Sequence, residues 1–96
     1  MTDDLDAISR DRSRGVRAKE LLDNELVQEG LASLKAEYLK AWETSPARDA
    51  EGRERLWIMV KLVDKFRTHL EQVWDTGKLA DAQLVEIERR KKFGIF

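Results

Sequence analysis

The stretch Thr44-Ser45-Pro46-Ala47-Arg48-Asp49 decides the fold, because it separates two long segments in which apolar residues recur at helical intervals. Serine is favoured at a helix N-cap. Proline is favoured at the first helical position, where its missing N–H would be unpaired anyway. Ser45-Pro46 therefore predicts that a helix begins at residue 46. Because the turn is short, the two segments should fold back on each other as an antiparallel hairpin.

The segment before this turn, residues 25–42, predicts the first helix of the hairpin. Its apolar residues follow each other at steps of three and four, as on one face of an α-helix. They are Val27, Leu31, Leu34, Tyr38 and either Ala41 or Trp42. Asn24, just before this segment, can accept hydrogen bonds from the first turn as an N-cap.

The segment after the turn, residues 46–76, predicts a much longer helix. Its apolar residues are Leu56, Met59, Val60, Val63, Phe66, Leu70, Val73 and Trp74. Gly77 follows and can take the left-handed conformation that closes many helices. At 1.5 Å per residue this helix would be about 45 Å long, against about 27 Å for its neighbour. The shorter helix leaves the apolar side chains from Phe66 onward uncovered. Flanking helices, another subunit or a partner must therefore cover them.

Antiparallel pairing around the predicted turn also sets a register for the hairpin. It places Leu34 near Leu56, Leu31 near Met59 and Val60, and Val27 near Val63.

The segments on either side of the hairpin predict less structure. Residues 1–13 contain four Asp and few apolar side chains, which predicts a flexible arm that is unfolded unless a partner orders it. Residues 14–22 and 80–91 each predict a short helix. We therefore expect an all-α fold, with a single helical domain over residues 14–96.

Composition excludes several classes of protein. The chain has 96 residues, is 39% charged and 42% hydrophobic, and contains no cysteine, so no disulfide framework is available. No strand-length run alternates apolar and polar residues. The acidic N-terminal segment predicts no signal peptide, and the longest apolar run, Leu56–Val60, is too short to cross a bilayer. We expect a cytoplasmic location, or the virion if a phage encodes the chain, and no contact with membranes.

No arrangement of residues indicates catalysis. His69 is the only histidine, and no carboxylate or thiol lies three or four residues from it, as a metal site on a helix would require. A catalytic triad would need a second reactive group beside this histidine. We expect no enzymatic activity, no cofactor, no metal and no small-molecule substrate.

Apolar residues outside the hairpin seam point to contacts with another protein. Trp57, Ile58 and Leu62 lie beside the predicted stripe, and a helix that is apolar nearly all round is usually covered on several sides. The terminal Phe93-Gly94-Ile95-Phe96 is apolar and favours docking over exposure. The predicted protein interface comprises Trp57, Ile58, Leu62, Phe66, Leu70, Trp74, Phe93, Ile95 and Phe96.

Two basic clusters support an alternative, the binding of nucleic acid. Lysine and arginine side chains can neutralise backbone phosphates. The candidate residues are Arg10, Arg12, Arg14, Arg17, Arg89, Arg90, Lys91 and Lys92. A cationic helix end is also favoured by the helix dipole alone, so the second cluster has a structural explanation as well.

Three phrases of the sequence resemble small α-helical proteins encoded by tailed phages and prophages of proteobacteria. They are Thr44–Asp49, Arg53-Glu54-Arg55-Leu56-Trp57 and Thr76-Gly77-Lys78-Leu79, within a likeness that covers about residues 14–96. The resemblance implies a context of virion assembly, DNA packaging or interference with a host protein. It implies no role for any single residue.

These observations lead to one preferred function and two alternatives. We expect a non-enzymatic assembly or adaptor protein that acts through protein–protein contacts, with itself as a homo-oligomer or with another protein. A packaging-type module that binds nucleic acid through the basic segments is the first alternative. A small inhibitor of a host protein is the second.

Overall fold

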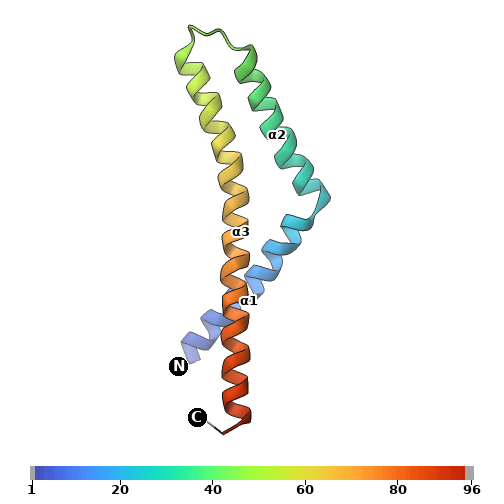
Figure 1. The fold of residues 1–96 in the computed structure, drawn as a ribbon, viewed down its shortest axis with the longest axis vertical. Coiled ribbons are helices and arrows are strands. Elements are labelled where there is room, and N and C mark those ends of the chain that lie inside the picture. The colour runs from blue at the N-terminus through green and yellow to red at the C-terminus, as the bar shows by residue number, and fades with distance from the viewer. Residues whose placement is uncertain (1, 95–96) are drawn as a thin grey trace. The chain divides into compact units, whose positions relative to one another are not determined.

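The computed structural model describes residues 2–94, and this part of the chain consists of three helices with no strand. Helix α1 spans Thr2–Asp23, α2 spans Glu25–Thr44 and α3 spans Ala50–Lys92 (Figure 1). The all-α fold expected from the sequence is confirmed. None of the described helices is both long enough and apolar enough to span a membrane.

The chain divides into two compact units, and α3 contributes to both. The hairpin unit is Leu22–His69, which contains α2 and the first part of α3. The crossing unit combines the segment up to Leu21 with the segment from Leu70, so that α1 packs with the second part of α3. The expectation of one helical domain over residues 14–96 stays a prediction.

In the hairpin unit, α2 begins where the sequence indicates. The side chain of Asn24 accepts hydrogen bonds from the backbone N–H groups of Leu26 and Val27, at 2.9 and 3.1 Å. These bonds satisfy two of the amide groups that the first turn of a helix leaves unpaired. Asn24 therefore separates α1 from α2 and caps the N-terminus of α2, as predicted.

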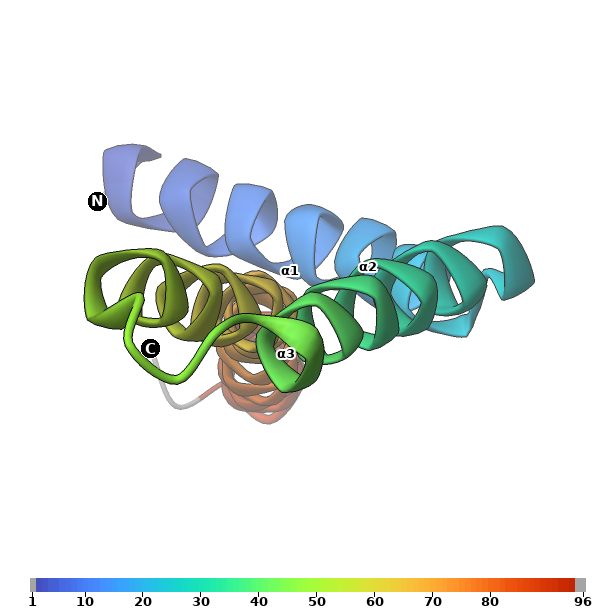
Figure 2. The same ribbon diagram turned by 90° about the horizontal axis from the view of Figure 1, so that it is seen from above.

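The turn between α2 and α3 is longer than predicted, because α3 begins at Ala50 and not at residue 46. Asp49 fills the N-cap position, where its Oδ1 accepts a hydrogen bond from the Gly52 N–H at 3.1 Å. Ser45 instead closes α2, since its N–H and its hydroxyl both donate to the carbonyl of Trp42. Pro46 opens a turn, and its carbonyl accepts from the Asp49 N–H. Figure 2 shows the loop that joins α2 to α3. Serine and aspartate both suit an N-cap, and here the aspartate occupies it.

The longer turn displaces the register of the hairpin. Lys35 Nζ donates to Asp64 Oδ1 at 2.9 Å, and Leu31 lines the same shallow groove as Val63 and Arg67. The predicted register placed Leu31 near Val60, which lies about one helical turn before Val63 on α3. Residues 46–49 belong to the turn and not to α3, so the first turn predicted for that helix does not exist.

Apart from residues 46–49, the segments 46–76 and 80–91, which were predicted as two helices, belong to one continuous helix. The predicted helix end at residue 76 is therefore wrong. Helix α3 continues through Gly77 to Lys92, so the segment 80–91 is its last part. Among the described residues only Gly94 has a positive φ, of 69°. Gly77 does not end a helix; it lies inside α3, where it packs closely against the backbone of α1. A Cβ on Gly77 would lie 2.6 Å from the Cα of Gly15 in α1. Glycine is needed here for close approach of two backbones.

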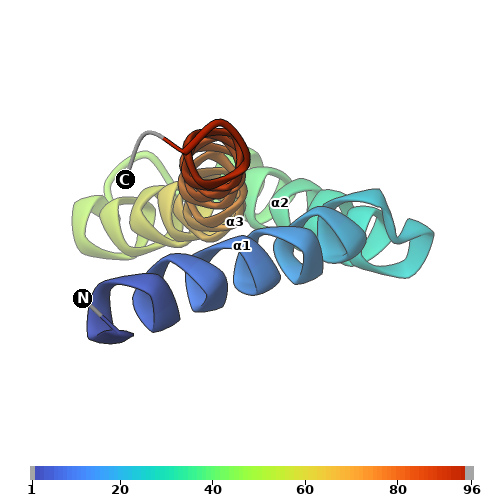
Figure 3. The same cartoon turned by 90° about the horizontal axis from the view of Figure 1, so that it is seen from below.

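Most of the segment predicted as a flexible arm is helical. Residues 2–13 form the first part of α1, which passes beside the second part of α3 (Figure 3). Most helical stability in proteins comes from tertiary packing and not from intrinsic propensity. Gly15, Ala18, Gly77 and Ala80 are buried in this unit. These small residues allow α1 to pack against α3 although the segment carries few large apolar side chains.

Candidate interaction surface

An exposed apolar row runs along α3 within the hairpin unit. It consists of Ile58, Leu62 and Phe66, which are 49%, 57% and 52% exposed. The constant spacing of four places these side chains on one face of the helix. We call this set the apolar row. Ile58 and Leu62 each lie two residues from Val60, and therefore about 200° around the helix from it.

Val60 marks the opposite, covered side of α3. Within Leu22–His69, all of which the structure describes, Val60 alone is classed as buried, with 3% of its surface exposed. The remaining apolar residues that face α2 are only partly covered; Leu31, Tyr38 and Val63 are examples. A hairpin of two helices thus buries little, while three large apolar side chains stay open to solvent on its outer face.

Trp57 is also exposed but lies apart from the apolar row. It is adjacent in sequence to Ile58, so it lies about 100° around the helix from it. The ammonium of Lys61 lies 4.4 Å from the centre of its ring. Such a cation–π contact at an exposed site contributes about 0.5–1 kcal/mol. Trp57 therefore already has a partner within its own helix.

The sequence also assigned Leu70 and Trp74 to the interface, and the structure places both in the crossing unit. Leu70 keeps only 7% of its surface exposed. Trp74 is half-buried, with Lys19 of α1 and Lys78 of α3 at 4.3 and 4.0 Å from its ring centre. Of the three possible covers left open by the sequence, the flanking helix is the one observed at Trp74. The exposed surface therefore does not include these two residues.

At the C-terminal end, Phe93 is exposed after the last turn of α3. Ile95 and Phe96 lie outside the described residues.

The N-terminal basic residues gain an arrangement that an unfolded arm would lack. Because residues 2–23 form a helix, Arg10, Arg14 and Arg17 lie on one exposed face of α1. Arg12 lies on a different side and pairs with Asp81 of α3 at 3.7 Å. The structure thus groups three of the four predicted arginines and separates the fourth.

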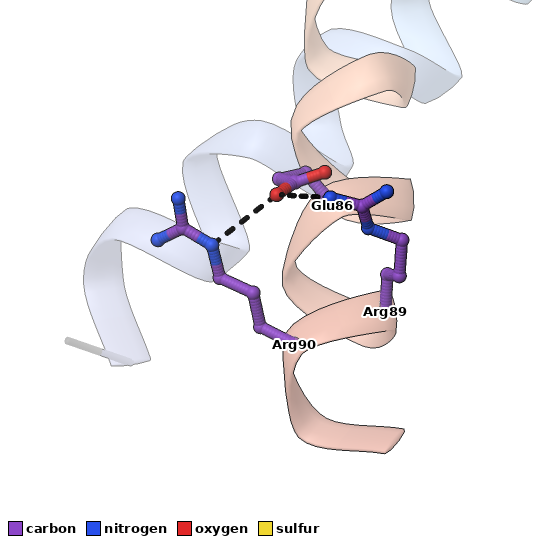
Figure 4. Close-up of polar contacts among 3 residues, drawn as sticks. All are labelled: Glu86, Arg89 and Arg90. Atoms are coloured by element: carbon purple, nitrogen blue, oxygen red, sulfur yellow. Dashed lines mark hydrogen bonds and ion pairs between the residues drawn. The ribbon is translucent and has the colours of Figure 1, made fainter. Parts of the chain in front are cut away.

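The C-terminal basic residues are partly compensated. Glu86 accepts from Arg89 at 3.4 Å and from Arg90 at 3.2 Å (Figure 4). Lys91 and Lys92 are exposed in the last turn. There the negative end of the helix dipole favours cations. The acidic neighbour and the helix end therefore account for much of this cluster.

His69 is exposed on α3. Residues 2–94 contain no group of three or more His, Cys, Asp or Glu side chains that could hold a metal ion.

Sequence reasoning missed a contact that fixes the hairpin turn. Arg53 donates to the carbonyl of Trp42 at 3.0 Å and to the hydroxyl of Ser45 at 2.9 Å. Its guanidinium also lies 4.2 Å from the centre of the Trp42 ring. The cation closes the C-terminal end of α2, where carbonyl groups are otherwise unpaired. In the sequence, Arg53 is only an arginine about one turn into α3. Its role cannot be inferred until the geometry of the turn between α2 and α3 is known.

The chain matches no protein-family model, no curated protein and no solved structure. The function must therefore be argued from the surface itself.

Proposed function

We propose that the chain is a non-enzymatic interaction module that buries the apolar row against another protein chain. The observation that carries the proposal is the pattern of exposure in the hairpin unit. Ile58, Leu62 and Phe66 are about half exposed on one helix face, while Val60 is the one residue classed as buried on the other side. Contiguous exposed apolar side chains of this kind typically mark sites of protein–protein contact.

The free energy available is sufficient for association. Full burial of a Leu, Ile or Phe side chain is worth about 1.5–3 kcal/mol, and roughly half of that remains to be gained by each residue of the row. Three such residues would contribute about 2–5 kcal/mol before contacts from neighbouring side chains are added. This is the scale of a small hot spot at the centre of an interface.

For the biological setting, the proposal draws on the resemblance of the sequence to phage-encoded helical proteins. An assembly component of a virion and an inhibitor of a host protein both need an exposed apolar face and no catalytic group. We favour the assembly role, because the row lies on a continuous helix that presents it as a regular surface. Regular secondary structure positions an interface more precisely than loops do.

The test compares the size of the native assembly in extracts of the cells that produce the protein. We expect the wild-type chain to elute in a complex larger than one chain, and Leu62→Glu to elute as a single chain. A buried unpaired carboxylate strongly opposes association. Thr68→Glu adds the same charge to an exposed position on α3, about 120° around the helix from Leu62, and should leave the complex intact. Elution of the wild type as a single chain would refute the proposal.

A second function is favoured by one observation, the shared face of Arg10, Arg14 and Arg17 on α1. Three cations on one helix face can contact successive phosphates of a nucleic acid. Binding would be followed by fluorescence anisotropy of a labelled DNA duplex between low and moderate salt. We expect each phosphate contact to add about 0.9 to the slope of log affinity against log salt. The triple variant with glutamine at these positions should lose that dependence, whereas Arg55→Gln should not.

A further inference from the structure

We propose that Ile95 and Phe96, the two residues that follow Gly94 in the sequence, dock into an apolar groove of the crossing unit of their own chain. We call these two residues the tail. The inference does not depend on the proposed function, because the groove belongs to the crossing unit and the apolar row to the hairpin unit.

The groove lies along the last part of α3 and is partly formed by α1. Its apolar lining comes from Ile8 of α1 and from Leu79, Ala82 and Ile87 of α3, and its polar lining from Gln83, Glu86 and Arg90. Its volume of about 420 Å³ lies within the range of pockets that hold small molecules, so there is room for two side chains. Leu79 keeps 70% of its surface exposed, so the described residues leave much of the groove open.

Gly94 turns the chain back towards this groove. It has a φ of 69°, and its N–H donates to the carbonyl of Lys91 at 3.2 Å. Both features belong to the Schellman motif, in which a glycine closes a helix. The motif is completed by the next residue, Ile95, whose N–H would donate to the carbonyl of Arg90, and an apolar contact between these two positions often accompanies it. Because Arg90 lines the groove, the motif directs Ile95 to the end of the groove.

Phe96 is long enough to reach Ile87 inside the groove. Gly94 lies seven residues after Ile87, which corresponds to about 10 Å along a helix axis. Two residues of backbone span at most about 7 Å, and the phenylalanine side chain covers the remainder. Leu79 lies eight residues further back and is out of reach. The tail would therefore cover the end of the groove at Ile87 and Arg90.

The chemistry of the groove suits this occupant. Isoleucine and phenylalanine side chains gain free energy when they leave water. The stem of Arg90 can cover them while its guanidinium stays beside Glu86, to which its Nε donates at 3.2 Å (Figure 4). A segment attached directly to the end of α3 also has a high effective concentration at the groove, so it competes well with any segment of another chain.

Nuclear magnetic resonance can test this docking with few signals, because the chain has four isoleucines, Ile8, Ile58, Ile87 and Ile95. In the purified chain, labelled with ¹³C at the isoleucine δ1 methyl groups, we expect nuclear Overhauser contacts between the Phe96 ring and the Ile87 methyl group. Phe96→Ala should remove these contacts and move the Ile87 signal, while the signal of Ile58 in the hairpin unit stays in place. An Ile87 signal that is the same in the wild type and in Phe96→Ala would overturn the docking.

Phe93→Ala is the matched control for Phe96→Ala. It removes a ring of the same kind that is 68% exposed and does not line the groove. The Ile87 signal should therefore keep its wild-type position in this variant. An equal displacement by both variants would mean that the signal reports any loss of a ring near the end of α3, and would also overturn the docking.

Two substitutions of Gly94 test the turn. Gly94→Ala should release the tail, because alanine resists a positive φ, and the Ile87 signal should move towards its position in Phe96→Ala. Gly94→Asn should stay close to the wild type, because asparagine adopts the left-handed conformation more readily. A wild-type Ile87 signal in Gly94→Ala would overturn the turn as the element that directs the tail.

A mixing experiment distinguishes the chain's own tail from the tail of a second copy. Labelled Phe96→Ala is mixed with an excess of unlabelled wild-type chain. We expect the labelled signals to stay as they are in Phe96→Ala alone, because each wild-type tail occupies its own groove. Return of the Ile87 signal to its wild-type position would show that a tail enters the groove of another copy, and would overturn docking within the chain.

Discussion

Gly15 and Gly77 meet backbone to backbone where α1 passes α3, and their contacts are reciprocal. A Cβ built on Gly15 would lie 2.7 Å from the Cα of Gly77 and 3.3 Å from the carbonyl oxygen of Val73. A Cβ built on Gly77 would lie 2.6 Å from the Cα of Gly15 and 3.0 Å from the carbonyl oxygen of Asp11. Each oxygen belongs to the residue four positions before the opposite glycine. The two helix backbones therefore meet at these glycines, and a carbonyl oxygen of the opposite helix lies beside each of them.

The first prediction concerns Gly77→Ala. Alanine in a helix interior is normally favoured over glycine by about 1 kcal/mol. At this site the new methyl group would overlap backbone atoms that cannot rotate away, and overpacking costs about 1–3 kcal/mol even where side chains can adjust. We therefore expect a net loss in the free energy of unfolding of about 1–2 kcal/mol, measured by urea denaturation.

Gly30→Ala is the matched control, because nothing lies within 4 Å of a Cβ at that helical position. It should raise the free energy of unfolding by about 0.5–1 kcal/mol. If both glycine variants were equally stabilised, the close contact between α1 and α3 would be wrong.

The second prediction concerns Arg53, which closes the C-terminal end of α2. Arg53→Ala removes hydrogen bonds to Trp42 and Ser45 and a cation–π contact. We expect the free energy of unfolding to fall by about 1–2 kcal/mol. Arg53→Lys should recover only part of this loss, because an ammonium lacks the planar fork of the guanidinium. Arg55→Ala, at an exposed position on the same helix, should change stability by less than about 0.5 kcal/mol. Equal effects of the two alanine variants would contradict this role.

The third prediction concerns the start of α3. Asp49→Ala removes the side chain that accepts from the Gly52 N–H and should cost about 1 kcal/mol, the usual value for an N-cap. Asp49→Asn keeps an accepting oxygen and should be nearly neutral. Thermal denaturation followed by circular dichroism would measure both. If Asp49→Ala left the stability unchanged, Asp49 would not be the N-cap of α3.

The fourth prediction tests the register of the hairpin through Lys35 and Asp64. These side chains are 43% and 46% exposed, so their ion pair is worth at most about 1 kcal/mol and weakens with added salt. Lys35→Glu should destabilise the chain at low salt, and addition of Asp64→Lys should restore most of the loss. A double-mutant cycle isolates the pair. A coupling free energy indistinguishable from zero at low salt would argue against the observed register.

Much of the hairpin could be predicted from the sequence, since periodic apolar positions and the Asn24 cap depend on local chemistry. The start of α3 could not, because Ser45 and Asp49 are both good N-cap residues and only the folded turn decides between them. The continuation of α3 past Gly77 could not be predicted from the sequence either. Glycine serves helix ends and close helix contacts alike, and its neighbours in sequence do not distinguish the two.

The exposure of the expected interface residues could be predicted in part, and their role in an interface stays a prediction. Ile58, Leu62 and Phe66 were all among the expected interface residues, and all three are exposed. Leu70 and Trp74 were included because they lie beyond the part of the long helix that the helix over residues 25–42 could cover, which left the flanking helices, another subunit or a partner as their cover. Helix α1 in fact starts at Thr2 and supplies Lys19 to the Trp74 ring. Tertiary packing of a segment with few apolar residues leaves little trace in its sequence.

The division of α3 between two units implies an order of folding. Lys35 and Asp64 in the hairpin unit are 29 residues apart, whereas Gly15 and Gly77 are more than twice as far apart along the chain. Closing a longer loop costs more chain entropy, and contacts between distant residues form more slowly. The hairpin should therefore form early, and the joining of the N-terminal helix to the second part of α3 should be the late, slower step.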